Sequence, residues 1–361
     1  MITSELWHGR RVFLTGHTGF KGSWLTLALH ALGAKVTGYA LDPVTSPSLF
    51  ALADIAALAG PGGQDINDAE RLKTALVAAQ PEIVFHMAAQ PLVRQSYVDP
   101  VGTWATNVMG TINLLEAVRA APSVKAVIVV TSDKAYAHAG TEGGCAEGDP
   151  LGGDDPYAGS KGATEIAVHA WRHSFFRNPD SPLIASVRAG NVIGGGDWSA
   201  DRIITDAVKA FMQGDHVALR YPGATRPWQH VLDALVGYLL LGQRLLVGDR
   251  PCATAYNFGP DARDTQPVHV LVEKLAAHFG VSEPWVQAPG EHPPEAPALT
   301  LNAGKAQREL DWQPVVDLDE ALRLTADWFN VWAAGADMRA VTEQQITRVM
   351  GRFQNLPETG R

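Results

Sequence analysis

The sequence has only two cysteines, Cys145 and Cys252, in 361 residues, and it has no Cys-x-x-Cys spacing. This scarcity excludes a disulfide framework and a cysteine zinc site, and it fits a chain that works in the reducing cytoplasm. The twelve histidines are scattered, with no His-Glu-x-x-His arrangement. We therefore expect no metal site.

Positive charge is also scarce, because 29 Lys and Arg against 38 Asp and Glu give a formal net charge of −9. This balance excludes a general nucleic-acid surface and an anionic-membrane surface. No uncharged apolar run is long enough to span a bilayer, and the first residues lack the basic and apolar regions of a signal peptide. We therefore expect a cytoplasmic protein whose partner is a small molecule, with any anion held by local cations and backbone amides.

What the sequence does contain is an alternation of short β-branched runs with helical stretches. Strand-like runs lie at 11–14, 35–41, 81–90 (a strand with its exit), 126–130, 183–188 and 255–258. This order is typical of an α/β fold with a doubly wound parallel sheet, and the length suggests about two domains. We expect a Rossmann-type domain of residues 1–188 plus about 228–262, a smaller interleaved C-terminal substrate domain of about 189–227 plus 263–340, and a polar, mobile tail of 341–361.

The first strand-like run is followed by a glycine turn, with Gly16, Gly19 and Gly22 spaced Gly-x-x-Gly-x-x-Gly before a helical run. Such glycines let the backbone approach a pyrophosphate and aim helix N-terminal amides at it. A plain tight turn is the alternative. At the end of the second run, where an acid usually holds the ribose hydroxyls of NAD, stands Ala40, with Asp42 two residues on. The sequence therefore predicts NAD without excluding NADP.

Two residues near this turn have open roles. Lys21 could hold a 2′-phosphate, or it could be an exposed lysine of the first helical turn. Asp65 could meet an adenine amino group, or it could cap the helix expected to start near Ala69.

A second motif follows the fourth strand-like run directly. Ser132, Asp133 and Lys134 come where parallel sheets place their ligands. Tyr157 and Lys161 stand four residues apart at an expected helix start. A lysine ammonium near a tyrosine lowers the pKa of the phenol, which can then take a proton from a substrate hydroxyl. Alone, the Tyr-x-x-x-Lys spacing is equally typical of a solvated helix face.

Together these motifs resemble the extended short-chain dehydrogenase/reductase superfamily. The resemblance is carried by residues 15–22, 86–89, 107, 132–133 and 157–161. Within that superfamily the chain is similar to the CDP-glucose 4,6-dehydratases, through residues 16–24, 88–94, 188–198 and 226–230.

The resemblance implies a lyase that holds NAD and converts CDP-glucose to CDP-4-keto-6-deoxyglucose and water by an internal hydride shuttle, in deoxysugar and O-antigen biosynthesis. It implies that Tyr157 takes the proton of the C4 hydroxyl and that Ser132 hydrogen-bonds the C4 oxygen. It assigns Asp133 as the acid at C6 and Lys134 as the base at C5. A lysine base must be neutral when it acts, and burial beside Lys161 would favour that form.

The resemblance also implies two sets of ligand contacts and a homodimer or homotetramer paired through two long helices. The cofactor contacts are Gly16, Thr18, Gly19, Phe20, Lys21, Gly22, Asp65, Ile66, Ala88, Ala89, Gln90, Asn107, Tyr157 and Lys161. The substrate contacts are Gln90, Asn191, Trp198, Arg202, Arg226 and His230. For four of these the residue type allows another role: an Asx turn for Asn191, a surface position for Arg202 and Arg226, and a packed core position for His230.

Two other functions are open at this point. A nucleotide-sugar 4-epimerase, or a dehydratase of another nucleotide hexose, would use the same fold, and an epimerase needs only the Tyr-Lys pair and room for the sugar to rotate. A catalytically silent nucleotide-binding scaffold would need none of these side chains, and the presence of Ser132, Tyr157 and Lys161 disfavours it.

Overall fold

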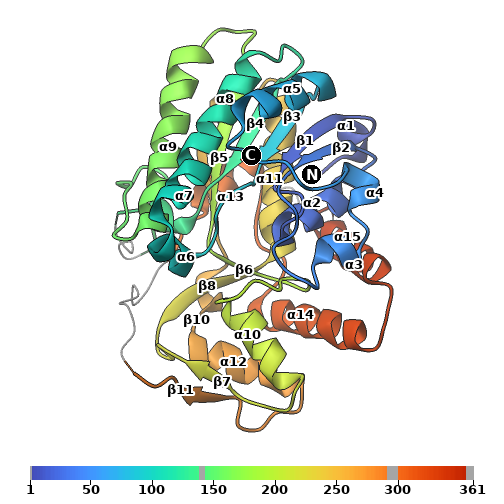
Figure 1. The fold of residues 1–361 in the computed structure, drawn as a ribbon, viewed down its shortest axis with the longest axis vertical. Helices are drawn as coiled ribbons and strands as arrows, with labels where there is room; N and C mark the ends of the chain where they lie inside the picture. Colours follow the sequence, from blue (N-terminus) through green and yellow to red (C-terminus); the bar gives the residue numbers. More distant parts are fainter. Residues whose placement is uncertain (1, 138–142, 291–299, 355–361) are drawn as a thin grey trace.

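A computed structural model describes residues 2–137, 143–290 and 300–354 of the chain (Figure 1). Its helices are α1 (Ser4–Trp7), α2 (Phe20–Ala31), α3 (Leu49–Leu52), α4 (Ala56–Ala59), α5 (Ala69–Ala79), α6 (Val93–Val98), α7 (Pro100–Trp104), η1 (Ala105–Met109), α8 (Gly110–Arg119), η2 (Asp133–Ala135), α9 (Pro156–Phe175), α10 (Ile203–Phe211), α11 (Val231–Leu246), η3 (Arg250–Cys252), η4 (Ala262–Asp264), α12 (Val268–Ala277), α13 (Gly304–Leu310), α14 (Leu318–Ala333) and α15 (Met338–Gln354). Its strands are β1 (Arg11–Thr15), β2 (Lys35–Tyr39), β3 (Ile83–His86), β4 (Ala126–Val130), β5 (Leu183–Ala189), β6 (Asn191–Ile193), β7 (Val217–Leu219), β8 (Thr225–His230), β9 (Ala255–Phe258), β10 (Thr265–Pro267) and β11 (Trp285–Gln287).

A six-stranded parallel sheet with the order β2-β1-β3-β4-β5-β9 forms the larger part of the molecule. All six strand-like runs of the sequence analysis are strands of this sheet. Strand β1 pairs with β2 on one side and β3 on the other, so the winding reverses between β1 and β3. In open α/β sheets ligands bind outside the carboxyl ends of the strands at such a reversal. We therefore expect a ligand to bind beyond the carboxyl ends of β1 and β3.

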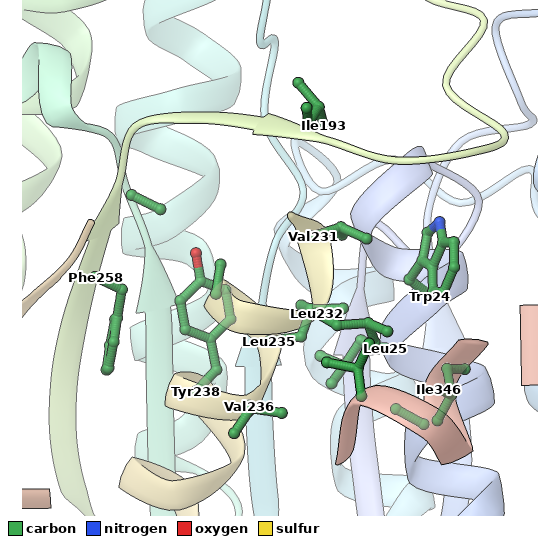
Figure 2. Close-up of a cluster of buried hydrophobic side chains, with 14 of the residues drawn as sticks. Trp24, Leu25, Ile193, Val231, Leu232, Leu235, Val236, Tyr238, Phe258 and Ile346 are labelled. Carbon is green, nitrogen blue, oxygen red and sulfur yellow. The ribbon is translucent and has the colours of Figure 1, made fainter. Parts of the chain in front are cut away.

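Helices cover both faces of the sheet because its strands alternate apolar side chains between two separate cores. Ile83 and Phe85 of β3 point into one core and Val84 into the other. Helices α2, α11 and α15 cover the first face, and α5, α8 and α9 cover the second (Figure 1). Figure 2 shows part of the first core, where side chains of α2, α11 and α15 converge. This is the doubly wound Rossmann arrangement that the sequence predicted.

A smaller region lies beyond the carboxyl ends of the strands (Figure 1). It holds the sheets β10-β8-β6 and β11-β7 together with α10, α12 and α14. The chain enters it twice, first after β5 and again after β9. The glycine run at the first entry is tightly packed, since a Cβ on Gly195 would lie 2.0 Å from Trp328 of α14 and one on Gly194 would lie 3.3 Å from Phe20 of α2. The Trp24 indole also donates to the Gly195 carbonyl at 2.9 Å.

The expectation of a polar, mobile tail from residue 341 is wrong up to residue 354. This segment belongs to helix α15, which packs against α2 and α11. Ile346, Val349 and Phe353 form a buried stripe at helical spacing. Thr342 accepts a hydrogen bond of 3.0 Å from the Trp328 indole. Residues 355–361 of the expected tail lie outside the described part of the chain.

Across the three described ranges, no helix is long and apolar enough to cross a membrane.

Candidate active site

The glycine turn between β1 and α2 fits a dinucleotide pyrophosphate. Gly16 has φ +78, and a Cβ there would lie 2.7 Å from the Ala88 amide nitrogen. A Cβ on Gly22 would lie 2.0 Å from the Gly16 carbonyl oxygen, so α2 approaches the turn as closely as glycine permits. No side chain caps the N-terminus of α2, which starts at Phe20. Its first backbone N–H groups are therefore open to an anion.

The end of β3, beside this turn, is fixed by a buried histidine. The Thr111 hydroxyl donates to the Asn107 carbonyl, so it accepts from Nε2–H of His86 at 2.9 Å. Nδ1 of His86 then accepts from the Thr15 hydroxyl at 2.7 Å, and the Thr15 oxygen receives the N–H of Ala88. Burial lowers the pKa of His86 to about 3, with a smaller contribution from the Lys161 charge. The neutral ring thus holds the exit of β3 against β1.

The chain after β3 is tied to α9 through an amide. Oδ1 of Asn107 accepts the Gln90 N–H at 2.8 Å, and its Nδ2 donates to the Ser160 hydroxyl at 2.9 Å. The Gln90 side chain hydrogen-bonds the backbone of Leu92 and the hydroxyl of Thr103 on α7. Both predicted ligand contacts, Gln90 and Asn107, therefore already have structural partners in the protein.

The structure shows that Asp65 does not cap helix α5, which was one of its two possible roles. Asp68, and not Asp65, caps α5 by accepting the Arg71 N–H at 3.1 Å. The Asp65 carboxylate accepts from the backbone and side chain of Asn67 instead. Ile66 is buried under the η1–α8 junction. Thr18, the other predicted cofactor contact here, donates to the Leu41 carbonyl at 2.8 Å.

The five residues predicted to be catalytic come together where β4 and α9 meet. Ser132 donates to Oδ1 of Asp133 at 2.9 Å and also hydrogen-bonds Tyr157. Nζ of Lys134 lies 3.9 Å from the same carboxylate oxygen. Oδ2 of Asp133 is buried and has no hydrogen-bond partner among the described residues, so a ligand can use it. Lys134 is less buried than expected, with 31% of its side chain exposed.

The tyrosine-lysine pair differs electrostatically from the expectation. Nζ of Lys161 lies 6.0 Å from the centre of the Tyr157 ring. Burial raises the pKa of Tyr157, and the hydrogen bond with Ser132 and the charge of Arg202 oppose that rise. Burial lowers the pKa of Lys161 to about 8, against the attraction of Glu165. The protein alone therefore favours the neutral phenol, because burial is the largest influence on the pKa of Tyr157.

Lys21 belongs to the same cluster, and its interpretation as an exposed lysine is wrong. Its ammonium donates to the Tyr238 hydroxyl of α11 at 3.4 Å. Burial lowers the pKa of Lys21 to about 8; the charges of Arg202 and Lys161 lower it further, and Asp133 opposes them. The site thus gathers three buried or half-buried lysines, Lys21, Lys134 and Lys161, around the Asp133 carboxylate. This excess of positive charge suits anionic ligands.

The predicted substrate contacts divide into two groups. Arg202 precedes α10, donates to the Pro91 carbonyl at 3.3 Å, and lies close enough to influence Tyr157. Asn191 starts β6, and Arg226 lies within β8, mostly buried.

The other two residues pack into the protein core. Trp198 packs on Phe329 and Trp332 of α14, with ring centres 5.0 and 4.5 Å away. His230 caps α11 through the Leu232 N–H and packs on Trp24, which agrees with the core alternative.

Sequence reasoning missed two buried residues behind the site, Glu165 and Arg188. They form an ion pair of 2.9 Å, with 3% of each side chain exposed. The signal for Glu165 was its position four residues after Lys161, on the same helical face. Tyr238 was also missed, because it lies in an apolar helical run with no polar pattern around it.

Known proteins are similar to this chain in sequence and in fold. The chain matches the sequence model of a family described as GDP-mannose 4,6 dehydratase over residues 13–325. It is 45% identical over 354 residues to a CDP-glucose 4,6-dehydratase from Salmonella typhimurium, which covers 97% of this chain and 99% of the relative.

Two solved structures have similar folds. A UDP-glucose 4-epimerase from Thermus thermophilus in complex with NAD has a TM-score of 0.75 and 26% identity, and the match covers 89% of this chain and 99% of that one. A dTDP-glucose 4,6-dehydratase from Streptomyces venezuelae with NAD bound has a TM-score of 0.75 at 23% identity, covering 89% and 97%.

Proposed function

The chain belongs to the GDP-mannose 4,6 dehydratase family, and we propose that within it the protein is a nucleotide-sugar 4,6-dehydratase acting on CDP-glucose. The observation that carries the proposal is the Asp133–Lys134 pair, placed directly beside Ser132 and Tyr157. Removal of water from a hexose requires an acid and a base next to the tyrosine that deprotonates the alcohol. The choice of CDP-glucose is supported by the Salmonella relative.

The cofactor is NAD, which when bound supplies hydride acceptance and donation. The residues present fit it. Gly16 and Gly22 allow the close turn, the uncapped start of α2 offers backbone N–H groups, and Ala88 keeps the exit of β3 narrow. The NAD complex of the Thermus epimerase supports the same choice.

The reaction can be assigned residue by residue. Tyr157 takes the proton of the C4 hydroxyl when that carbon is oxidised, and Ser132 holds the C4 oxygen. The C4 ketone acidifies the C5 proton, which Lys134 removes. Asp133, through the oxygen without a protein partner, protonates the leaving C6 hydroxyl, so that water departs. The hydride taken from C4 would then be added at C6, and Lys134 would return a proton to C5, which completes the 4-keto-6-deoxy sugar. Lys161 supplies positive charge 6.0 Å from the Tyr157 ring centre, and the positive charge of a bound oxidised nicotinamide would add to it. Together these charges would favour the phenolate that the first step needs.

Incubation with CDP-glucose in heavy water tests this assignment. We expect a CDP-4-keto-6-deoxy sugar with solvent deuterium at C5, and hydrogen labelled at C4 should be found at C6. UDP-glucose, dTDP-glucose and GDP-mannose serve as competing substrates for the choice of base and hexose. A 4-epimer formed without loss of water would identify an epimerase instead. Unchanged CDP-glucose, with the protein folded and NAD supplied, would exclude the proposal.

We also propose that the protein is a cytoplasmic homodimer or homotetramer. Seven large apolar side chains are exposed on four elements that pack against one another, α6, α7, η1 and α9. They are Tyr97, Val98, Val101, Trp104, Met109, Ile166 and Phe175. Exposed apolar groups gathered in this way are typical of protein–protein contacts, and a symmetric dimer would cover them with the same elements of a second copy. Analytical ultracentrifugation distinguishes monomer, dimer and tetramer.

A further inference from the structure

The turn that carries Ser132, Asp133 and Lys134 is fastened at both ends to one buried ion pair. On its N-terminal side, the Thr131 hydroxyl donates to Oε1 of Glu165. On its C-terminal side, Nη1 of Arg188 donates to the Tyr136 hydroxyl at 2.7 Å. No residue between Thr131 and Tyr136 contacts the pair in any hydrogen bond of the described structure. The pair therefore holds the two ends and leaves the catalytic side chains free.

The ion pair itself is built for rigidity. Arg188 binds both carboxylate oxygens of Glu165, at 3.0 and 2.9 Å, in the fork geometry that arginine favours. Burial opposes the charge of Glu165, but the hydrogen bonds and charge of Arg188, with those of Thr131 and Ser186, lower its pKa overall. Because both charges are buried and paired, removing one partner is far costlier than any surface change.

The position of Glu165 in the chain connects this pair to the other half of the site. Glu165 lies on α9 one turn after Lys161 and two turns after Tyr157. Arg188 lies on β5, next to β4, whose end becomes the catalytic turn. One ion pair thus joins the helix that bears the tyrosine and lysine to the turn that bears the acid and base.

We propose that Glu165 and Arg188 are positioning residues that set Asp133 and Lys134 against Tyr157 and Lys161, acting through Thr131 and Tyr136. This inference rests on the proposed dehydratase function. Its consequence is that loosening the turn slows the loss of water more than the oxidation at C4. Oxidation depends on Tyr157 and Lys161, which stay on α9, and on the turn through Ser132 alone. Water loss depends on both Asp133 and Lys134, which lie further along the turn.

The chain offers a matched control. Ser186 donates to Oε2 of Glu165 at 2.7 Å, in the same buried environment, but it lies on β5 and has no hydrogen bond to the turn. Thr131→Val and Tyr136→Phe each remove one hydroxyl that fastens the turn, and Ser186→Ala removes one hydroxyl that does not. A merely structural role predicts that all three variants behave alike.

The experiment follows single turnovers of CDP-glucose with each NAD-loaded variant, recording the near-ultraviolet absorbance of the reduced cofactor and the release of dehydrated product. Thr131→Val also removes a bond to the Val187 carbonyl, and Tyr136→Phe also removes one to Asn257. We expect both variants to slow formation of the dehydrated sugar by at least about fivefold, the factor for a single lost hydrogen bond. Formation of the reduced cofactor should slow by less than about twofold, so that the reduced cofactor accumulates. Ser186→Ala should retain both rates. Equal slowing in all three variants, or equal slowing of both steps, would overturn the proposal.

Amide hydrogen exchange of the unliganded protein separates this inference from the proposed function. Thr131→Val and Tyr136→Phe should accelerate exchange at residues 132–135, and Ser186→Ala should not. If the wild-type protein produced no dehydrated sugar, the function would fail and this exchange pattern alone would decide the positioning role. Unchanged exchange in the first two variants would contradict that role whatever the enzyme's activity.

Discussion

Replacing Gly22 by alanine should damage both the fold and cofactor binding. The added Cβ would lie 2.0 Å from the Gly16 carbonyl oxygen, where an ordinary contact needs at least 3.4 Å. The difference, 3.4 − 2.0 = 1.4 Å, must come from movement of α2 away from the turn, because a backbone oxygen cannot rotate aside. Overpacking of this kind costs roughly 1–3 kcal/mol of unfolding free energy.

The same displacement predicts the effect on NAD binding. A hydrogen bond of about 2.9 Å that lengthens by more than 1 Å is lost. Each bond from a backbone N–H to a charged group contributes about 1.5–3 kcal/mol. Loss of one such bond weakens binding by about 10- to 100-fold. Isothermal titration calorimetry measures the dissociation constant, and chemical denaturation without NAD measures the stability.

Gly19→Ala is the matched control for stability. Gly19 has φ −80, which alanine adopts freely, and its Cβ would meet the Gly16 oxygen at 3.4 Å. Its unfolding free energy should stay within about 0.5 kcal/mol of wild type. The reasoning is refuted if Gly22→Ala is as stable as Gly19→Ala, or if it binds NAD within twofold of the wild-type protein.

Three further predictions concern acid–base groups and assembly. Burial raises the pKa of Asp233 from 3.8 to about 8, so the folded state keeps a proton that the unfolded state releases. The stability from this proton is complete below pH 3.8 and is lost as the pH rises to about 8. The melting temperature should therefore fall across that range, and it should fall less steeply for Asp233→Asn, which keeps the bond from the Val315 N–H. Lys134→Met should slow deuterium incorporation at C5 by at least about 100-fold while the sugar still reduces the cofactor, whereas Tyr157→Phe should stop both. Deuterium uptake by Lys134→Met at the wild-type rate would contradict the base assignment. Val101→Glu, at a side chain that is 79% exposed, should yield monomers in ultracentrifugation with an unchanged thermal midpoint for the protomer, and an intact oligomer would place the interface elsewhere.

The sheet and the reactive turn were predictable because local patterns determine them. Strand β4 is a run of β-branched and small apolar residues, and a strand buried on both faces needs such a run. Ser132, Asp133 and Lys134 follow it directly, so the end of that strand fixed their location. Tyr157 and Lys161 needed only the helical repeat to share a face.

Sequence reasoning could not predict the structure where a residue's surroundings come from distant parts of the chain. The burial of Lys21 depends on Tyr238, 217 residues further on. Trp198 is a core residue because α14 brings Phe329 and Trp332 to it. The stripe of α15 was hidden by the polar residues between its apolar positions. Tertiary packing, which no local pattern reports, decided all three.

The neutral histidine at the end of β3 has a consequence for how acid affects the enzyme. His86 would gain a proton only near pH 3, so the Thr15–His86–Thr111 chain keeps one arrangement under any mildly acidic assay condition. A rate that declines between neutrality and pH 5 must therefore originate in groups other than this imidazole. The hydrogen bonds that hold the end of β3 against β1 therefore do not change in mild acid, although they are made by histidine, the side chain that most often senses protons.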